Sequence, residues 1–281
     1  MSECKLFVDY EQHEAGVRMI TLIEELAAKK ESAQLESLII GDWGGAYETD
    51  SSATVEALVR LKDRFPKLRS LFIGDMSYEE CEVSWINQSN LGPLLVAYPE
   101  LISFTIKGST GLSLEPARHD KLQQLTIICG GLGKDVIASI SKGSFKSLQK
   151  LELYLGVEEY GFDGSLEDVL KLIEPGKFPQ LTYLGLKDSE IQDEIAIAIA
   201  NAPIVDQLHT LDLSLGTLTD KGAEALLLSD KIMKLQFLDL NYHYMSDNMM
   251  DRWNQSGINV DISDQQDTDE HEDYRYPSLT E

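Results

Sequence analysis

The chain has 281 residues, 43% of them hydrophobic, which is enough to build a continuous core in one or two ordinary domains. Its 48 acidic and 24 basic side chains give a formal net charge of −24, and a surface of that charge excludes unassisted binding to nucleic acid or to an anionic membrane. Residues 1–20 lack a signal-peptide pattern, and no run approaches the roughly eighteen apolar residues of a membrane span, so we expect a cytoplasmic protein.

The N-terminal segment differs from the rest of the chain. Residues 5–10 (KLFVDY) predict a strand, and residues 14–30 predict an amphipathic helix with Val17, Ile20 and Ile23 on one face. This segment lacks the leucine phrase that follows it. We therefore interpret residues 1–34 as a cap over the open hydrophobic end of a repeat array, because terminal repeats are usually atypical.

A six-residue phrase of the form L-x-x-L-x-L then recurs, with conservative replacements, eight times. The last two copies are LHTLDL and LQFLDL, 27 residues apart, and a recurrence of this kind identifies a leucine-rich repeat. Successive copies are separated by 33, 33, 21, 26, 33, 27 and 27 residues. Their first residues are Leu35, Leu68, Leu101, Leu122, Leu148, Leu181, Leu208 and Leu235.

Each phrase predicts a strand whose fourth and sixth positions point into the core and whose third, fifth and seventh positions point outward. The segments between the phrases show helical patterns, such as residues 189–202, which end before Pro203, and residues 247–253, which Ser246 caps. In the most regular unit, Thr219 is placed to cap a short helix. Strands that alternate with crossover helices predict an α/β leucine-rich-repeat solenoid, a horseshoe with a concave parallel sheet and outer helices.

The uneven steps locate the irregular segments. The 21-residue step after Leu101 is too short for a full helix and predicts a turn. Long loops are expected at residues 41–52, 74–90 and 156–165, all leaving the C-terminal ends of strands and therefore lying on one rim. Residues 258–262 predict a closing strand, so the repeats with this strand cover residues 35–262. Residues 263–281 form an acidic tail that can order only if its aromatic residues dock on the body.

The segment LDLSLGTLTDKGAEALL resembles the ribonuclease-inhibitor-like class of leucine-rich repeats, with Leu218 and Gly222 at the L-x-x-x-G positions that begin the helix. The whole chain is similar to a family of bacterial cytoplasmic leucine-rich-repeat proteins of unknown biochemical function. This similarity is carried by GDMSYEECEVSWINQSN, YLGLKDSEI, LDLSLGTLTD, HYMSDNMMD and YRYPSLTE. The resemblance implies no reaction, and at the level of the repeat class it implies protein binding on the concave face.

Motifs for catalysis or cofactor binding are not found in the sequence. The segment CGGLGK at residues 129–134 resembles a phosphate loop, but Ile128 replaces the first glycine and Asp135 replaces the hydroxyl residue, so we interpret it as a tight turn. Cys4, Cys81 and Cys129 have no zinc or disulfide spacing, and the histidines are dispersed. We therefore predict no catalytic residue, no metal site and no cofactor, and we expect that the protein is not an enzyme.

The outward strand positions of the C-terminal repeats combine carboxylates with aromatic residues. This composition is typical of a protein-recognition surface, and it would attract a basic partner. A mixed, merely solvated sheet face is an equally good interpretation. We expect a monomer that binds one protein partner of unknown identity. The candidate partner-binding residues are Glu152, Tyr154, Tyr183, Asp212, Phe237, Asp239 and Asn241.

Two further hypotheses involve other parts of the chain. The long rim loops could form the site of an enzyme or a small-ligand-binding protein, because long loops often carry function. Alternatively, the tail could fold over the concave face, with Tyr274 and Tyr276 as anchors. The residues proposed to line a rim-loop pocket are Trp43, Asp75, Trp85 and Tyr160.

Overall fold

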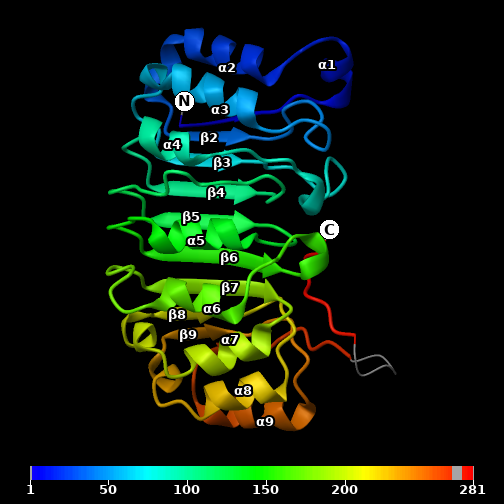
Figure 1. The fold of residues 1–281 in the computed structure, drawn as a ribbon, viewed down its shortest axis with the longest axis vertical. Helices are drawn as coiled ribbons and strands as arrows, with labels where there is room; N and C mark the ends of the chain where they lie inside the picture. Colours follow the sequence, from blue (N-terminus) through cyan, green and yellow to red (C-terminus); the bar gives the residue numbers. More distant parts are fainter. Residues whose placement is uncertain (1, 268–273, 281) are drawn as a thin grey trace. The chain divides into compact units, whose positions relative to one another are not determined.

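The computed structural model describes residues 2–267 and 274–280, and it divides into two compact units (Figure 1). The first unit consists of the residues up to 128 together with 138–148, and the second consists of residues 129–137 and 149–280. Each unit alternates strands with helices. Within the described residues, no helix is long and apolar enough to cross a lipid bilayer.

The strands of the first unit pair in parallel and in chain order. Their register places Lys5, Ile39, Phe72, Thr105 and Thr126 in one row across the sheet. The strands are β1 (Glu3–Leu6), β2 (Ser37–Ile40), β3 (Ser70–Ile73), β4 (Ser103–Lys107) and β5 (Gln124–Ile128).

The second unit repeats this arrangement with five more parallel strands. Here the row across the sheet consists of Glu152, Gly185, Asp212, Asp239 and Asp261. The strands are β6 (Lys150–Gly156), β7 (Tyr183–Ser189), β8 (Thr210–Asp212), β9 (Phe237–Asp239) and β10 (Val260–Asp261). The predicted closing strand is present as β10, shorter than expected.

In each unit the longer helices lie against one face of the strands, and none of the described helices lies on the other face (Figure 1). No helix separates β4 from β5 in the described chain, which confirms the turn predicted from the 21-residue step. The helices are α1 (Tyr10–Glu14), α2 (Met19–Ala28), α3 (Ser52–Arg60), α4 (Gly92–Ala97), α5 (Lys134–Lys142), α6 (Leu166–Leu170), α7 (Gln192–Ile199), α8 (Asp220–Leu227) and α9 (Asp247–Ser256).

The core confirms the predicted strand register. Leu38 and Ile40, at the fourth and sixth positions of their phrase, are completely buried, and so are Leu211 and Leu213. These side chains pack between the strands and the helical layer, while the alternate residues project to the open face. The leucine phrase therefore specifies which face of each strand is buried.

Two predicted helices begin or end at different residues in the structure. The helix expected at residues 14–30 is instead two helices, α1 and α2. Asp9 starts α1 early by forming a capping box with Gln12. Gly16, with a φ of 88°, separates α1 from α2. The helix expected at residues 189–202 begins later, because β7 extends to Ser189. The predicted caps of α8 and α9 are confirmed: the hydroxyls of Thr219 and Ser246 accept hydrogen bonds from the first turn of each helix.

The backbone turns sharply after several strands. At the eighth position of the leucine phrase, Gly108 has a φ of 91°, a conformation that glycine adopts at low cost. The same position in the last three phrases is occupied by Asp188, Leu215 and Tyr242, with φ of 54°, 66° and 60°. Left-handed backbone at a residue with a side chain costs about 1–3 kcal/mol, so the surrounding structure must hold Asp188, Leu215 and Tyr242 in this conformation. We call these three residues the corners.

Candidate binding surface

The open face of β6–β9 contains a compact network of charged and aromatic side chains. Gly185 lies at its centre, between Glu152 on β6 and Asp212 on β8. A side chain at Gly185 would lie 3.3 Å from both Glu152 Cγ and Tyr183 Cε1. The glycine therefore leaves room for the longer side chains of β7 to reach the carboxylates of the two neighbouring strands.

Lys187 connects these two strands. Its ammonium nitrogen lies 3.0 Å from Asp212 Oδ2 and 3.4 Å from Glu152 Oε1. Only 12% of the Lys187 side chain is exposed. Burial acts to lower the pKa of Lys187, but Asp212, Tyr154 and Glu152 outweigh it, so the pKa of Lys187 is raised and the ammonium stays charged.

A second lysine completes the charge balance of the network. Lys150 Nζ lies 2.7 Å from Glu152 Oε2 and 4.5 Å from the centroid of the Tyr183 ring. Lys187 Nζ lies 5.2 Å from the centroid of the Tyr154 ring. Each cation thus contacts a carboxylate and the ring of an aromatic side chain, and both rings are fixed in place by these contacts.

Hydroxyl groups satisfy the remaining acceptors of Asp212. The Tyr183 hydroxyl donates to Asp212 Oδ2, and the hydroxyl and N–H of Ser214 donate to Oδ1 at 2.6 and 3.1 Å. Burial, followed by the charge of Asp212, raises the pKa of Tyr183, so this phenol stays a donor. Asp212 is therefore an ion-paired and fully hydrogen-bonded carboxylate.

The structure places the candidate partner-binding residues in two environments. Glu152 and Asp212 point to the open face but are only 9% and 2% exposed, because the lysines and tyrosines cover them. Phe237, Asp239 and Asn241 are half-buried beside them on and after β9. Burial, with repulsion from Asp212 and Asp261, raises the pKa of Asp239. Our candidate set lacked Lys150 and Lys187, although both occupy outward positions of their phrases.

The rim-loop candidates differ in their surroundings. Trp43 is buried in its own loop, where its indole N–H donates to Thr49 O at 2.9 Å. Asp75 forms an ion pair with Lys5 at 2.8 Å, and 61% of Trp85 is exposed. Tyr160 belongs to the second unit. The small-ligand hypothesis for these loops therefore stays a prediction.

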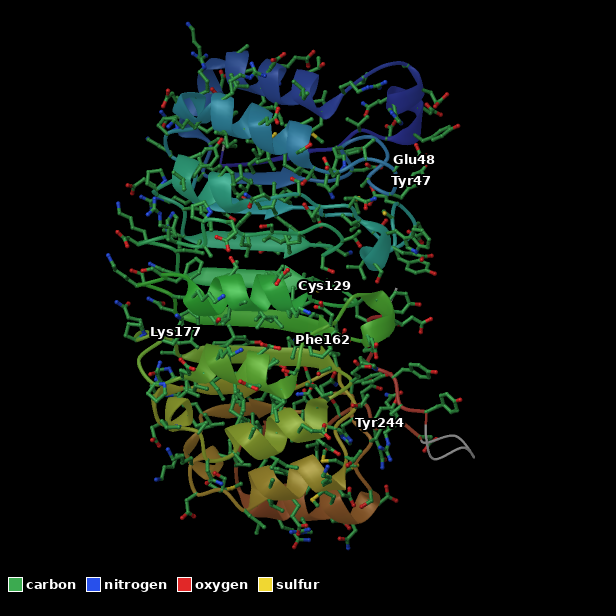
Figure 2. All side chains as sticks on the ribbon, viewed as in Figure 1. Tyr47, Glu48, Cys129, Phe162, Lys177 and Tyr244 are labelled. Atoms are coloured by element: carbon green, nitrogen blue, oxygen red, sulfur yellow. The ribbon has the colours of Figure 1, made fainter. Side chains whose placement is uncertain are left out.

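Two of the rim loops do lie together in the first unit. The backbone and side-chain N–H groups of Asn87 both donate to Ala46 O, and the hydroxyls of Ser51 and Ser89 are 2.8 Å apart. The first of these loops also presents Tyr47 and Glu48 on its exposed side (Figure 2). This agrees with the predicted arrangement of these two loops on one rim.

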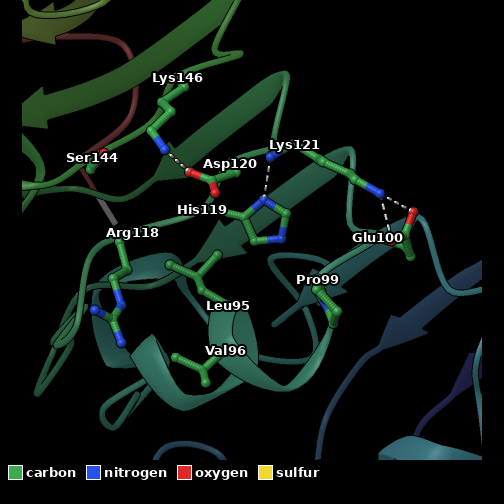
Figure 3. A pocket seen from close by; sticks show the side chains of 10 residues that line it. All are labelled: Leu95, Val96, Pro99, Glu100, Arg118, His119, Asp120, Lys121, Ser144 and Lys146. Atoms are coloured by element: carbon green, nitrogen blue, oxygen red, sulfur yellow. Dashed lines mark hydrogen bonds and ion pairs between the residues drawn. The ribbon is translucent and has the colours of Figure 1, made fainter.

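A cavity of about 620 Å³ lies in the first unit, at the edge where β4 and β5 begin (Figure 3). Its histidine, His119, is structural: Nε2 faces Tyr98 O at 3.0 Å, and Nδ1 accepts the backbone N–H groups of Lys121 and Leu122. Ion pairs of Lys121 with Glu100 and of Lys146 with Asp120 border the cavity. The histidine and these two carboxylates therefore have partners within the protein.

Comparisons with known proteins agree with the repeat pattern. A leucine-rich-repeat family model matches residues 208–227. The crystal structure of a protein from Bacteroides fragilis aligns with a TM-score of 0.90 and 36% identity, over 99% of this chain and 77% of that one. An internalin from Listeria monocytogenes aligns over 93% of this chain and 96% of its own, with 14% identity and a TM-score of 0.37. No curated protein matches the chain.

The family-model match and the Bacteroides fragilis structure, together with parallel strands that alternate with helices, confirm the predicted α/β leucine-rich-repeat solenoid fold. The Bacteroides fragilis structure shows the same arrangement along nearly the whole of this chain. The chain is a leucine-rich-repeat protein and belongs to the same family as the Bacteroides fragilis protein.

Proposed function

We propose that the protein is a non-catalytic scaffold that binds a protein partner on the open face of β6–β9. The observation that carries this proposal is the network around Lys187. It holds two tyrosine rings and three ion pairs on a sheet face that none of the described helices of the unit covers. Open sheet faces of this kind are the surfaces that repeat proteins use for binding.

The energetics of the network favour a role in binding over a role in stability alone. Charges buried to this extent are costly to desolvate, and a packed apolar cluster would stabilise the sheet equally well or better. What the ion pairs do supply is a fixed position for the Tyr154 and Tyr183 rings. Aromatic side chains that are already ordered lose less conformational entropy on binding, which supports their use as anchors for a partner.

The open face carries more carboxylates than its two lysines balance, which favours a basic partner. Lys150 and Lys187 balance Glu152 and Asp212, whereas Asp239 and Asp261 continue the row and form no ion pair with any described residue. The net charge of −24 would add long-range attraction for a basic surface. The same charge disfavours nucleic acid and anionic membrane as partners. The proposal includes a cytoplasmic, monomeric protein, in keeping with three free cysteines.

The test compares two substitutions with the same change of charge. Asp239→Lys alters the open face, and Asp251→Lys alters an exposed position on α9, on the helical side. Tagged wild-type and variant chains are purified from the native cell, and the co-purifying proteins are identified by mass spectrometry. We expect a partner that is retained by wild type and Asp251→Lys, lost with Asp239→Lys, and released by increasing salt.

Thermal melting of both variants checks that neither has unfolded. Equal recovery of the same proteins by Asp239→Lys and Asp251→Lys, both folded, would rule out the open face of β6–β9 as the binding surface.

A further inference from the structure

The C-terminal tail docks on the second unit, at Asp188 near the end of β7 and at the corners that follow β8 and β9. The Leu279 N–H donates to Asp188 Oδ1 at 2.8 Å, and the Ser278 N–H donates to Leu215 O at 2.8 Å. The Tyr242 hydroxyl donates to Tyr276 O at 3.2 Å. The three residues that receive the tail are therefore three of the four non-glycine residues with left-handed backbone, the fourth being Asp264.

Tyr244, labelled in Figure 2, makes two hydrogen bonds with the backbone of Tyr276. Its hydroxyl donates to Tyr276 O at 3.0 Å and accepts the Tyr276 N–H at 3.1 Å. The corners thus bind the tail through its main chain, at Tyr276, Ser278 and Leu279. Between them, Pro277 is the buried residue, and a proline can be buried there at little cost because it has no N–H that needs a partner.

The tyrosines of the tail contribute little to this contact. Tyr274 and Tyr276 are 63% and 53% exposed, and their rings stack on each other with centroids 6.3 Å apart. The anchors are therefore the backbone of Tyr276 and the ring of Pro277, and not the two aromatic rings that the sequence suggested. Residues 268–273, which precede the docked segment, lie outside the described residues.

One oxygen in this site is left without a partner by the tail. Asp188 is completely buried, and its Oδ2 has no hydrogen-bond partner among the described residues. A buried polar atom of this kind is costly unless a hydrogen-bonding group reaches it. The tail therefore fills the site without satisfying it, and a segment that brings a further polar group to Asp188 Oδ2 would bind more tightly.

We propose that the corners formed by Asp188, Leu215 and Tyr242, with Tyr244, are a peptide-binding site, and that the chain's own segment 276–279 is its replaceable resident ligand. The partner that fits is an extended segment of another protein with an aromatic–proline–x–leucine pattern. The aromatic residue before the proline favours extended backbone, and its N–H and C=O then both face the Tyr244 hydroxyl. The N–H groups of the two residues after the proline remain available for Leu215 O and Asp188 Oδ1. This site is distinct from the open face proposed above.

The test uses the intact ¹⁵N-labelled chain and an unlabelled peptide with the sequence of residues 274–281. Hydrogen exchange of the Ser278 and Leu279 amides is followed by NMR. If the peptide takes the place of the tail, both amides exchange faster, by on the order of tenfold when the peptide is well above its dissociation constant. The amide of Leu184, in β7, should exchange at an unchanged rate.

Two N-methylated peptides provide the matched controls. Methylation of the Leu279 amide removes the donor to Asp188, and this peptide should displace the tail at least about tenfold less well. Methylation of the Arg275 amide, which makes no hydrogen bond in the described part of the chain, should have little effect.

A full-length Pro277→Gly variant, whose own tail is held less tightly, makes displacement easier to detect. Unchanged exchange at Ser278 and Leu279 in both wild type and this variant would show that the tail is a fixed part of the fold and would overturn the proposal. Equal displacement by the two methylated peptides would overturn it as well, because binding would then not depend on the corners.

Discussion

The Lys187 ammonium nitrogen lies 3.0 Å from Asp212 Oδ2, with 12% and 3% of the two side chains exposed. This pair joins β7 to β8 at a point where Gly185 leaves the sheet face open to longer neighbours. It explains why a carboxylate at an outward position is nevertheless buried. The charge of Asp212 is balanced by Lys187 inside the network. A partner would therefore contact the tyrosines and Asp239 around Asp212.

Replacing Lys187 by methionine, which has a similar length, should destabilise the protein by about 3–5 kcal/mol, because Asp212 and Glu152 would lose the cation they share. Urea unfolding measures the effect. Lys146→Met is the matched control, since Lys146 pairs with Asp120 on the exposed surface and its loss should have no measurable effect. A loss for Lys187→Met as small as that of the control would contradict the assigned role.

Two glycines with left-handed backbone should differ strongly in their tolerance of alanine. A side chain at Gly156 (φ of 73°) would collide with the backbone of Gly130, whereas one at Gly257 (φ of 79°) would meet nothing within 4 Å. We expect Gly257→Ala to cost about 1 kcal/mol, from backbone strain alone. Gly156→Ala should cost several-fold more, or prevent folding. Similar melting temperatures for the two variants would show that the turn after β6 is less crowded than described.

The stability of the second unit should depend on the ionisation of Asp188. Burial raises the pKa of Asp188 to about 7, although the Leu279 and Ser278 amides and Lys187 act to lower it. The folded state therefore keeps the proton at pH values where the unfolded chain has lost it. This contribution to stability is present below about pH 4, decreases as the pH rises, and is lost above about pH 7.

Asp188→Asn removes this titration while keeping an acceptor for Leu279. The free energy of unfolding of the variant, relative to wild type, should therefore increase between pH 4.5 and pH 8, by on the order of 2–4 kcal/mol. Urea unfolding at the two pH values measures it. Asp230→Asn, at an exposed position, is the control. An equal difference between Asp188→Asn and wild type at both pH values would be inconsistent with a buried, titrating Asp188.

The three cysteines should react with iodoacetamide in two groups. Cys4 is partly exposed, whereas Cys81 and Cys129 are buried, and burial with the charges of Asp42 and Glu82 raises the pKa of Cys81 to about 11. In the native protein we expect labelling of Cys4 alone, and in urea labelling of all three. Peptide mass spectrometry distinguishes the sites. Native labelling of Cys129 as fast as that of Cys4 would contradict its burial and the hydrogen bond that its thiol donates to Tyr154 O.

The sequence by itself determined the repeat architecture, because the leucine phrase acts locally. Its alternating positions decide which side chains are buried, and they correctly separated Leu38 and Ile40 from their outward neighbours. Local chemistry also identified the caps at Thr219 and Ser246. The same local chemistry was misread at Asp9, where a capping box begins α1 earlier than the apolar periodicity suggested.

The tertiary structure alone decided how the outward side chains combine. Lys187 on β7 is far in the chain from Glu152 on β6 and from Asp212 on β8, and only strand pairing brings the three into one network. The docking of residues 276–279 on Asp188, some ninety residues away, likewise depends on three corners that meet in space. Periodicity specifies the face on which a residue lies, whereas ion pairs and hydrogen bonds depend on distances between strands that no single repeat contains.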